Sequence, residues 1–151
     1  MSGAKLKEKL QKTLLTKNNN FMDCIEFAKE YINSKGFKIE DENENIIAFK
    51  YQMHILHIWK NDSDERFACI ALTNFTDITP ENTPRIKEIC NEMNTNIKQA
   101  KLYVMDETIM ATAEVYFRDQ EDFNFQTEIA LRNLMGAKIQ FKKLERLMTG
   151  E

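Results

Sequence analysis

The sequence predicts an α+β domain in which an antiparallel sheet packs its apolar face against helices. Apolar residues recur every three or four positions near the start, in the middle and at the end of the chain, which is typical of amphipathic helices. Between these segments apolar and polar residues alternate with a period of two, as in strands with one covered face. Two-residue turns at Gln52-Met53 and Asp106-Glu107 join four strands into antiparallel hairpins. The predicted order is therefore α-β-β-β-α-β-β-α, with five or six strands and with helices one and three on one face.

The composition fits one globular domain. A chain of 151 residues can bury a sizeable core, and 42% hydrophobic with 30% charged residues is an ordinary balance for a folded protein. The net charge of -3 provides no general positive field to attract nucleic acid. No stretch approaches the ~20 apolar residues of a membrane span, and residues 1–15 lack the apolar run of a signal peptide. We expect a cytoplasmic protein that binds neither nucleic acid nor membranes.

The chain divides into an N-terminal extension and one domain. Residues 1–20 are predicted to form a helical or flexible extension, and residues 21–148 the single α+β domain. Basic residues concentrate at both ends of the chain, a pattern that favours solvated faces of amphipathic helices. These residues are Lys5, Lys7, Lys9, Lys12, Lys138, Lys142, Lys143 and Arg146.

The first helix is predicted over residues 21–34. Its apolar stripe has members four, three and four positions apart, namely Phe21, Ile25, Ala28 and Ile32. Phe27 lies off the edge of that stripe. Gly36 follows, and glycine readily adopts the left-handed backbone conformation that ends a helix.

Three or four strands follow. Residues 37–40 form a plausible edge strand, and residues 46–51 and 54–60 form the first hairpin. A turn at Gln52-Met53 places Tyr51 opposite His54, Phe49 opposite Leu56 and Ile47 opposite Ile58, which collects one apolar set on a single face. A polar loop over residues 61–65 leads to residues 66–75, a strand that is apolar on both sides and so is expected to be central.

The second half of the chain is predicted to form a helix, a second hairpin and a last helix. Thr79-Pro80 and Thr83-Pro84 each pair a capping residue with a proline, and they predict a helix that runs to about residue 98. Residues 100–105 and 109–117 form the second hairpin, with Val104 opposite Ile109 and Leu102 opposite Ala111. Asp122 is expected to cap a last helix that runs to about residue 148.

Both hairpins leave a second sheet face that is unusually apolar for a surface in water. Three interpretations of it remain open: helix two or the N-terminal segment covers it within the subunit, a second copy covers it in a homodimer, or another protein binds it. Aromatic and methionine side chains are enriched at such protein–protein surfaces. The candidate protein-binding residues are Ile55, His57, Trp59, Tyr103, Met105, Met110 and Tyr116.

No catalytic, cofactor-binding or metal-binding set is predicted. His54 and His57 are three positions apart on one strand, so they project to opposite faces and cannot share an ion. Cys69 can approach one of these histidines, but its apolar neighbours predict an inert thiol. The four glycines form no phosphate-binding loop. We therefore expect a protein that is not an enzyme and has no cofactor.

A short sequence run resembles a known family. Helix two ends in Cys90-Asn91-Glu92-Met93-Asn94 and is followed by a strand and an acidic turn, which resembles the YbjN family of small bacterial proteins. In that family an aromatic residue usually stands at the position of Met93. The element order of residues 21–146 is similar to that of the family, whose fold is like that of the type III secretion chaperones. The resemblance implies this fold, a tendency to form homodimers and no enzymatic activity. Family members are often labelled sensory transduction regulators.

Two functions follow as expectations. The first is a non-enzymatic protein-binding module, chaperone-like or regulatory, that acts through the apolar sheet face or as a homodimer. The alternative is a small-molecule-binding domain, with or without an enzymatic step, whose pocket lies between sheet and helices. Tyr51 and His54 are the polar residues expected to point into that layer.

Overall fold

The computed structural model describes residues 22–150 and contains three helices and six strands within that range. The predicted extension over residues 1–20 lies outside the described residues. The helices are α2 (Cys24–Ser34), α3 (Thr83–Asn96) and α4 (Gln120–Thr149). The strands are β1 (Lys38–Glu42), β2 (Ile46–Tyr51), β3 (His54–Asn61), β4 (Asp64–Thr73), β5 (Ala100–Met105) and β6 (Thr108–Tyr116). The predicted α+β class and element order are confirmed.

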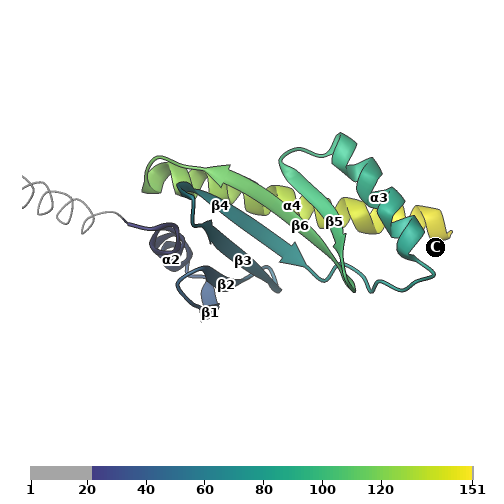
Figure 1. The fold of residues 1–151 in the computed structure, drawn as a ribbon, viewed down its shortest axis with the longest axis horizontal. Coiled ribbons are helices and arrows are strands. Elements are labelled where there is room, and N and C mark those ends of the chain that lie inside the picture. The colour runs from purple at the N-terminus through teal and green to yellow at the C-terminus, as the bar shows by residue number, and fades with distance from the viewer. Residues whose placement is uncertain (1–21, 151) are drawn as a thin grey trace, which may run out of the picture.

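The strands form one antiparallel sheet in the order β1-β2-β3-β4-β6-β5. The long helix α4 runs along the sheet, with α2 near one end of the molecule and α3 near the other (Figure 1). β4 lies between the two hairpins, as expected for a strand that is apolar on both sides. β1 is the sixth strand and forms one edge of the sheet.

Both predicted hairpin registers are confirmed. Tyr51 pairs with His54, Phe49 with Leu56 and Ile47 with Ile58 in the first hairpin, and Val104 pairs with Ile109 in the second. Gln52 and Met53 have φ angles of 46° and 67°. Positive φ at both turn residues gives the loop a twist that matches the strands it connects. The turns therefore determine which side chains share a face.

The ends of α2 follow local sequence signals. The Asp23 side chain accepts a hydrogen bond from the Glu26 amide at 3.1 Å, and the Glu26 carboxylate accepts one from the Asp23 amide at 3.0 Å. At the other end Gly36 has a φ of 71°, and the Phe37 amide donates to the Ile32 carbonyl at 3.0 Å. This reciprocal cap and left-handed stop restrict the helix to its eleven residues.

Two predicted helix caps were wrong. The cap of α4 is Asp119, whose carboxylate accepts from the Asp122 amide at 2.8 Å, so Asp122 lies in the first turn. α3 begins at Thr83 with Pro84 in its first turn, so its N-cap position is Asn82, whose side chain makes no capping hydrogen bond. Thr79 lies in the preceding loop, where it forms reciprocal hydrogen bonds with Asn82 at 2.8 and 3.2 Å. In each case several residues near the helix start are chemically able to cap, so residue type alone does not identify the cap.

The loop predicted over residues 61–65 is shorter than expected. The Asn61 side chain accepts hydrogen bonds from the Ser63 amide at 2.9 Å and the Ser63 hydroxyl at 2.7 Å. These bonds form a tight turn, so Asn61 and Asp64 pair as strand residues. The first hairpin and β4 thus form a continuous three-stranded unit.

The hydrophobic core lies between one face of the sheet and all three helices. Buried residues of α2, α3 and α4 join strand residues such as Ile58, Ile70 and Ala111 in a single cluster. Phe27 belongs to this cluster and is 6% exposed, although it was predicted to lie off the helix stripe. The rings of Phe117 and Phe123 approach it to centroid distances of 5.1 and 6.0 Å, so a second helix and a strand end bury that flank.

We predict that α4 stabilises the fold through the side chains on its inner face alone. Phe141 is fully buried, with its ring edge-to-face against Phe75 at 5.8 Å, whereas Phe125 on the same helix is 61% exposed. Phe141→Ala should lower the free energy of unfolding by about 3–5 kcal/mol because it removes buried area and leaves a cavity. Phe125→Ala should change it by less than about 0.5 kcal/mol. Urea denaturation followed by circular dichroism measures both, and equal effects would contradict this orientation of α4.

Candidate functional site

The sheet face opposite the core, hereafter the open face, carries the candidate residues. The ladder pairs Trp59 with Cys69 and Cys69 with Glu114, and it pairs Tyr103 with Met110, so these side chains project to one side. Within the described part of the chain, no residue of this face belongs to the core cluster that joins the three helices. On strands β2 to β6 the open face consists of Ile46, Ala48, Lys50, Ile55, His57, Trp59, Phe67, Cys69, Ala71, Thr73, Lys101, Tyr103, Met105, Thr108, Met110, Thr112, Glu114 and Tyr116.

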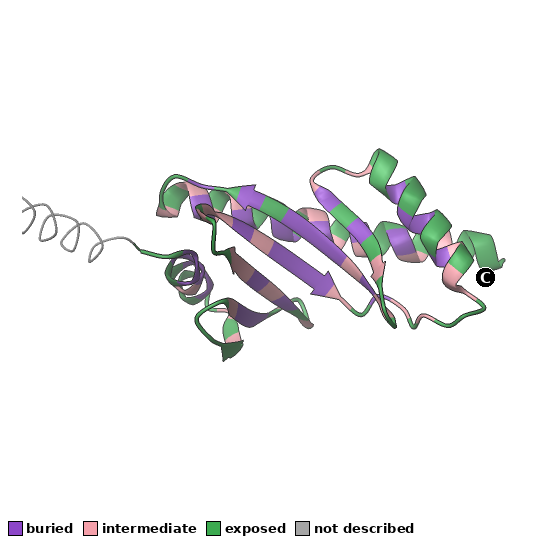
Figure 2. Cartoon of the chain, in the orientation of Figure 1, coloured by how far each residue is buried: buried purple, intermediate pink, exposed green. Residues whose placement is uncertain are grey.

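All seven residues predicted from the sequence lie on the open face. Tyr116 is 63% exposed, and Ile55, Tyr103 and Met105 are each about two-fifths exposed. His57, Trp59 and Met110 are partly buried. The alternation of exposed and buried residues along the strands is visible in Figure 2. The role of these residues in binding a protein stays a prediction at this point.

Helix two does not cover the open face. The inward residues of α3, among them Ile86, Ile89 and Met93, pack into the core on the other side of the sheet. The interpretation in which helix two shields the aromatic residues was therefore wrong. The N-terminal segment, the other intramolecular candidate, lies outside the described residues.

The row of residues that crosses the middle of the open face carries three short side chains, and His57 stands between two of them. Ala48, Ala71 and Thr112 are at most 8% exposed, although none of the helices within residues 22–150 packs on this side of the sheet. Longer side chains stand around this centre, and two contacts hold some of them in place. The Tyr103 hydroxyl donates to the Met110 sulfur at 3.0 Å, and the Phe67 and Tyr116 rings meet edge-to-face at 5.2 Å. The longer side chains stand above the short ones, and their aromatic rings and methionine sulfurs are available for contact with a partner protein.

The titratable groups on this face do not form a nucleophilic pair. The ladder places His57 diagonally next to Cys69. Burial raises the pKa of the Cys69 thiol to about 11, with the Glu114 carboxylate adding to the effect, and burial lowers the pKa of His57. A reactive thiolate beside an imidazolium needs the opposite shifts. Burial, together with the charges of Cys69 and Glu114, also raises the pKa of Tyr103.

His54 lies on the opposite side of the sheet from His57. Its Nδ1 is 2.7 Å from the Gln52 carbonyl oxygen, and its Nε2 faces the Lys138 ammonium group. These partners select the tautomer that donates through Nδ1 and accepts through Nε2. Across residues 22–150 no three metal-binding side chains come together, and no helix there is long and apolar enough to cross a membrane.

Comparison with solved structures supports the fold resemblance. YbjN from E. coli, described as a candidate transcription regulator, superposes with a TM-score of 0.60 over 83% of this chain and 93% of that chain, at 9% identity. An uncharacterized protein from Methanothermobacter thermautotrophicus gives 0.56 over 80% of this chain and 96% of that chain, at 15% identity. No protein-family model and no curated protein matches the chain. The chain therefore has the YbjN fold, and the fold alone is what these matches show.

Sequence reasoning missed part of the open face. Phe67 and Cys69 belong to it, but the apolar residues on both sides of their strand indicated only a central position. The signal that could have found them is the register of β4 against its neighbours, which depends on pairs far apart in the sequence. The basic residues near the end of α4, interpreted as a solvated helix face, line a hollow that is described below.

We predict that Cys69 reacts slowly with iodoacetamide at pH 8. Its pKa rises from 9.0 to about 11 in the folded protein, and only the thiolate is nucleophilic. The folded state therefore retains the proton, so the associated stability is complete below pH 9 and is lost as the pH rises towards 11. The labelling rate of the peptide that contains Cys69, measured by mass spectrometry, should increase about tenfold per pH unit from 7 to 10. A plateau by pH 8 would show a lowered pKa instead.

Proposed function

We propose that the chain is a non-enzymatic, protein-binding module of chaperone-like or regulatory type whose open face docks a second copy of the same chain. The observation that carries this proposal is the aromatic-rich sheet face, which no other element within residues 22–150 covers. YbjN, which shares the fold, is described as a candidate transcription regulator, and this description favours a regulatory role here. Because the chain has a net charge of -3, we favour regulation through protein contacts over contacts with nucleic acid.

The open face approaches the size of a standard protein–protein interface. The five strands β2 to β6, at about 4.8 Å spacing and each extended over about six residues, give a projected area on the order of 500 Å² before the side chains that stand above the sheet are counted. Standard interfaces bury about 800 Å² per partner, and two sheets can pack face to face about 10 Å apart. The projected area is below this value, and the side chains that stand above the sheet, such as Tyr116, add to it.

The charge pattern favours a second copy over a charged partner. A two-fold interface brings a surface against itself, so a patch of one sign would repel its mate. The open face is uncharged at its centre, and its charged residues are of both signs. Lys101 and Glu114 lie 3.7 Å apart within one subunit, and Lys50 is near the opposite margin. Such a surface is compatible with itself and offers no strong field to select an acidic or basic protein.

The test compares two exposed aromatic residues on different surfaces. Tyr116 on the open face and Phe125 on α4 are 63% and 61% exposed. We expect the unmodified protein to be a dimer in sedimentation equilibrium. Tyr116→Glu should weaken dimerisation by about 30-fold or more, corresponding to about 2 kcal/mol, because it places a charge in a desolvated interface. Phe125→Glu should leave the dimer unchanged.

Circular dichroism and thermal denaturation establish that both variants remain folded. A protein that is monomeric at tens of micromolar, with or without Tyr116→Glu, would contradict the homodimer. If the protein is monomeric and a hetero-partner is lost with Tyr116→Glu, the open face binds another protein instead. A dimer that is disrupted by Phe125→Glu and tolerates Tyr116→Glu would move the interface to α4.

A further inference from the structure

A hollow on the outer flank of α4 is a second surface with its own chemistry. It has a volume of about 600 Å³ and lies between the last four turns of the helix and the start of β3, where His54 contributes to its wall. Volumes of about 300–1,000 Å³ are usual for small-molecule sites. The hollow is on the helix side of the sheet and shares no lining residue with the open face.

Apolar side chains line the hollow at helical spacing. Met135, Ile139 and Leu147 recur along one flank of α4, and Ile139 and Leu147 are each 69% exposed. The core-facing stripe of the helix is a different one, which includes Leu134 and Phe141. Met135 is partly buried and packs against the core, whereas the described part of the chain leaves Ile139 and Leu147 largely uncovered.

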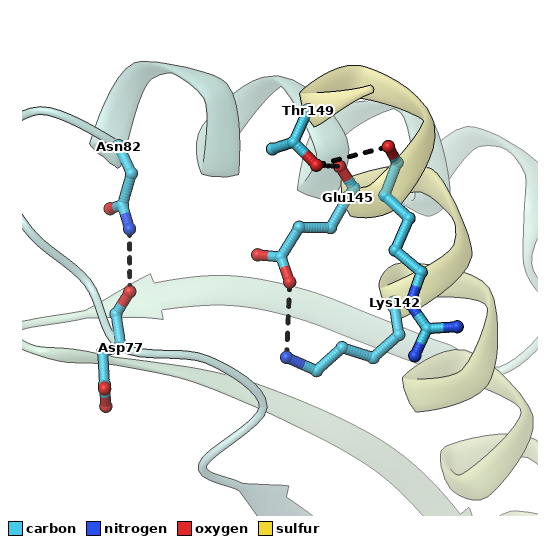
Figure 3. Close-up of polar contacts among 6 residues, drawn as sticks. Asp77, Asn82, Lys142, Glu145 and Thr149 are labelled. Atoms are coloured by element: carbon cyan, nitrogen blue, oxygen red, sulfur yellow. Dashed lines mark hydrogen bonds and ion pairs between the residues drawn. The ribbon is translucent and has the colours of Figure 1, made fainter. Parts of the chain in front are cut away.

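Four cations surround these apolar groups, in a chain whose net charge is negative. They are Lys138, Lys142, Lys143 and Arg146. Lys142 forms an ion pair with Glu145 at 3.3 Å (Figure 3), and Lys138 contacts His54. Among residues 22–150, Lys143 and Arg146 form no ion pair with a carboxylate.

The dipole of α4 does not explain this cluster. Cations stabilise the last turn of a helix by interacting with its partial negative charge, and Arg146 lies in that turn. The effect disappears beyond one turn, whereas Lys138 and Ile139 lie about three turns from the end. A purely solvated helix face would also not alternate its cations with exposed Ile139 and Leu147.

We propose that this hollow binds one molecule of an anionic amphiphile, such as a fatty acid or an alkyl phosphate. The apolar flank contacts the chain of the ligand, while Lys143 and Arg146 pair with its carboxylate or phosphate group. The hollow is walled by α4 and, on its other side, by His54, so it fits a single soluble molecule better than a flat lipid surface. The proposal is independent of the homodimer, because α4 and the open face are on opposite sides of the sheet.

The test measures binding of dodecyl phosphate below its micelle concentration by isothermal titration calorimetry. We expect one molecule per chain, with affinity that falls as salt is added. Inorganic phosphate and the neutral dodecyl maltoside should each bind at least tenfold more weakly, because the first has no alkyl chain and the second has no negative charge. The double variant Lys143→Gln/Arg146→Gln should lose at least tenfold in affinity, whereas Lys87→Gln on the exposed face of α3 should be unchanged.

Both residues of the double variant are exposed, so the fold should survive, and circular dichroism checks that it does. Ile139→Glu provides a second test, because it places a negative charge against the ligand and should abolish binding. Equal affinity for dodecyl maltoside, no effect of the double variant, or no binding at millimolar ligand would each overturn the proposal. Binding only to vesicles of anionic phospholipid, measured by flotation, would overturn it in favour of a membrane contact.

Discussion

The alternation of side chains across the sheet is the constraint on which the rest of this structure depends. Because successive residues of a strand point to opposite faces, a slip of one residue in either hairpin would exchange its core and surface residues. The turns at Gln52-Met53 and at Asp106-Glu107 are each two residues long, which leaves one register for each hairpin. Phe49 and Leu102 therefore face the helices, and Trp59 and Tyr103 face away from them. Both the core and the open face follow from this one geometric rule.

Sequence patterns within single strands and turns were sufficient to predict the two hairpins. Alternation within β2, β3, β5 and β6 was sufficient to assign both registers and all seven candidate residues to one face. The stop at Gly36 was also readable, because a left-handed residue after a helix is a property of the local chain. These predictions required only interactions between residues close in sequence.

Features that depend on distant contacts were not readable. Phe27 is buried because Phe117 and Phe123 approach it, and no pattern within α2 indicates their position. The caps at Asn82 and Asp119 were missed for a different reason: the hydrogen bonds there are local, but neighbouring Thr79 and Asp122 are also residue types that cap helices. The pairing of β4 with β6 placed Phe67 beside Tyr116 on the open face. The hollow on α4 could not be predicted from the helix sequence, because His54, which contributes to its wall, comes from β3.

The open face and the hollow on α4 differ in charge, so we expect them to bind different kinds of partner. The open face is aromatic and nearly neutral, so burial of apolar area would drive its association, with little dependence on salt. The flank of α4 combines apolar groups with Lys143 and Arg146, so binding there should weaken as salt is added. Since the sheet lies between them, a dimer formed through the open face would leave both copies of the hollow accessible. Any influence of one surface on the other would have to pass through the packing of α4 on β4 and β6, and an amphiphile would affect dimerisation only if it changed that packing.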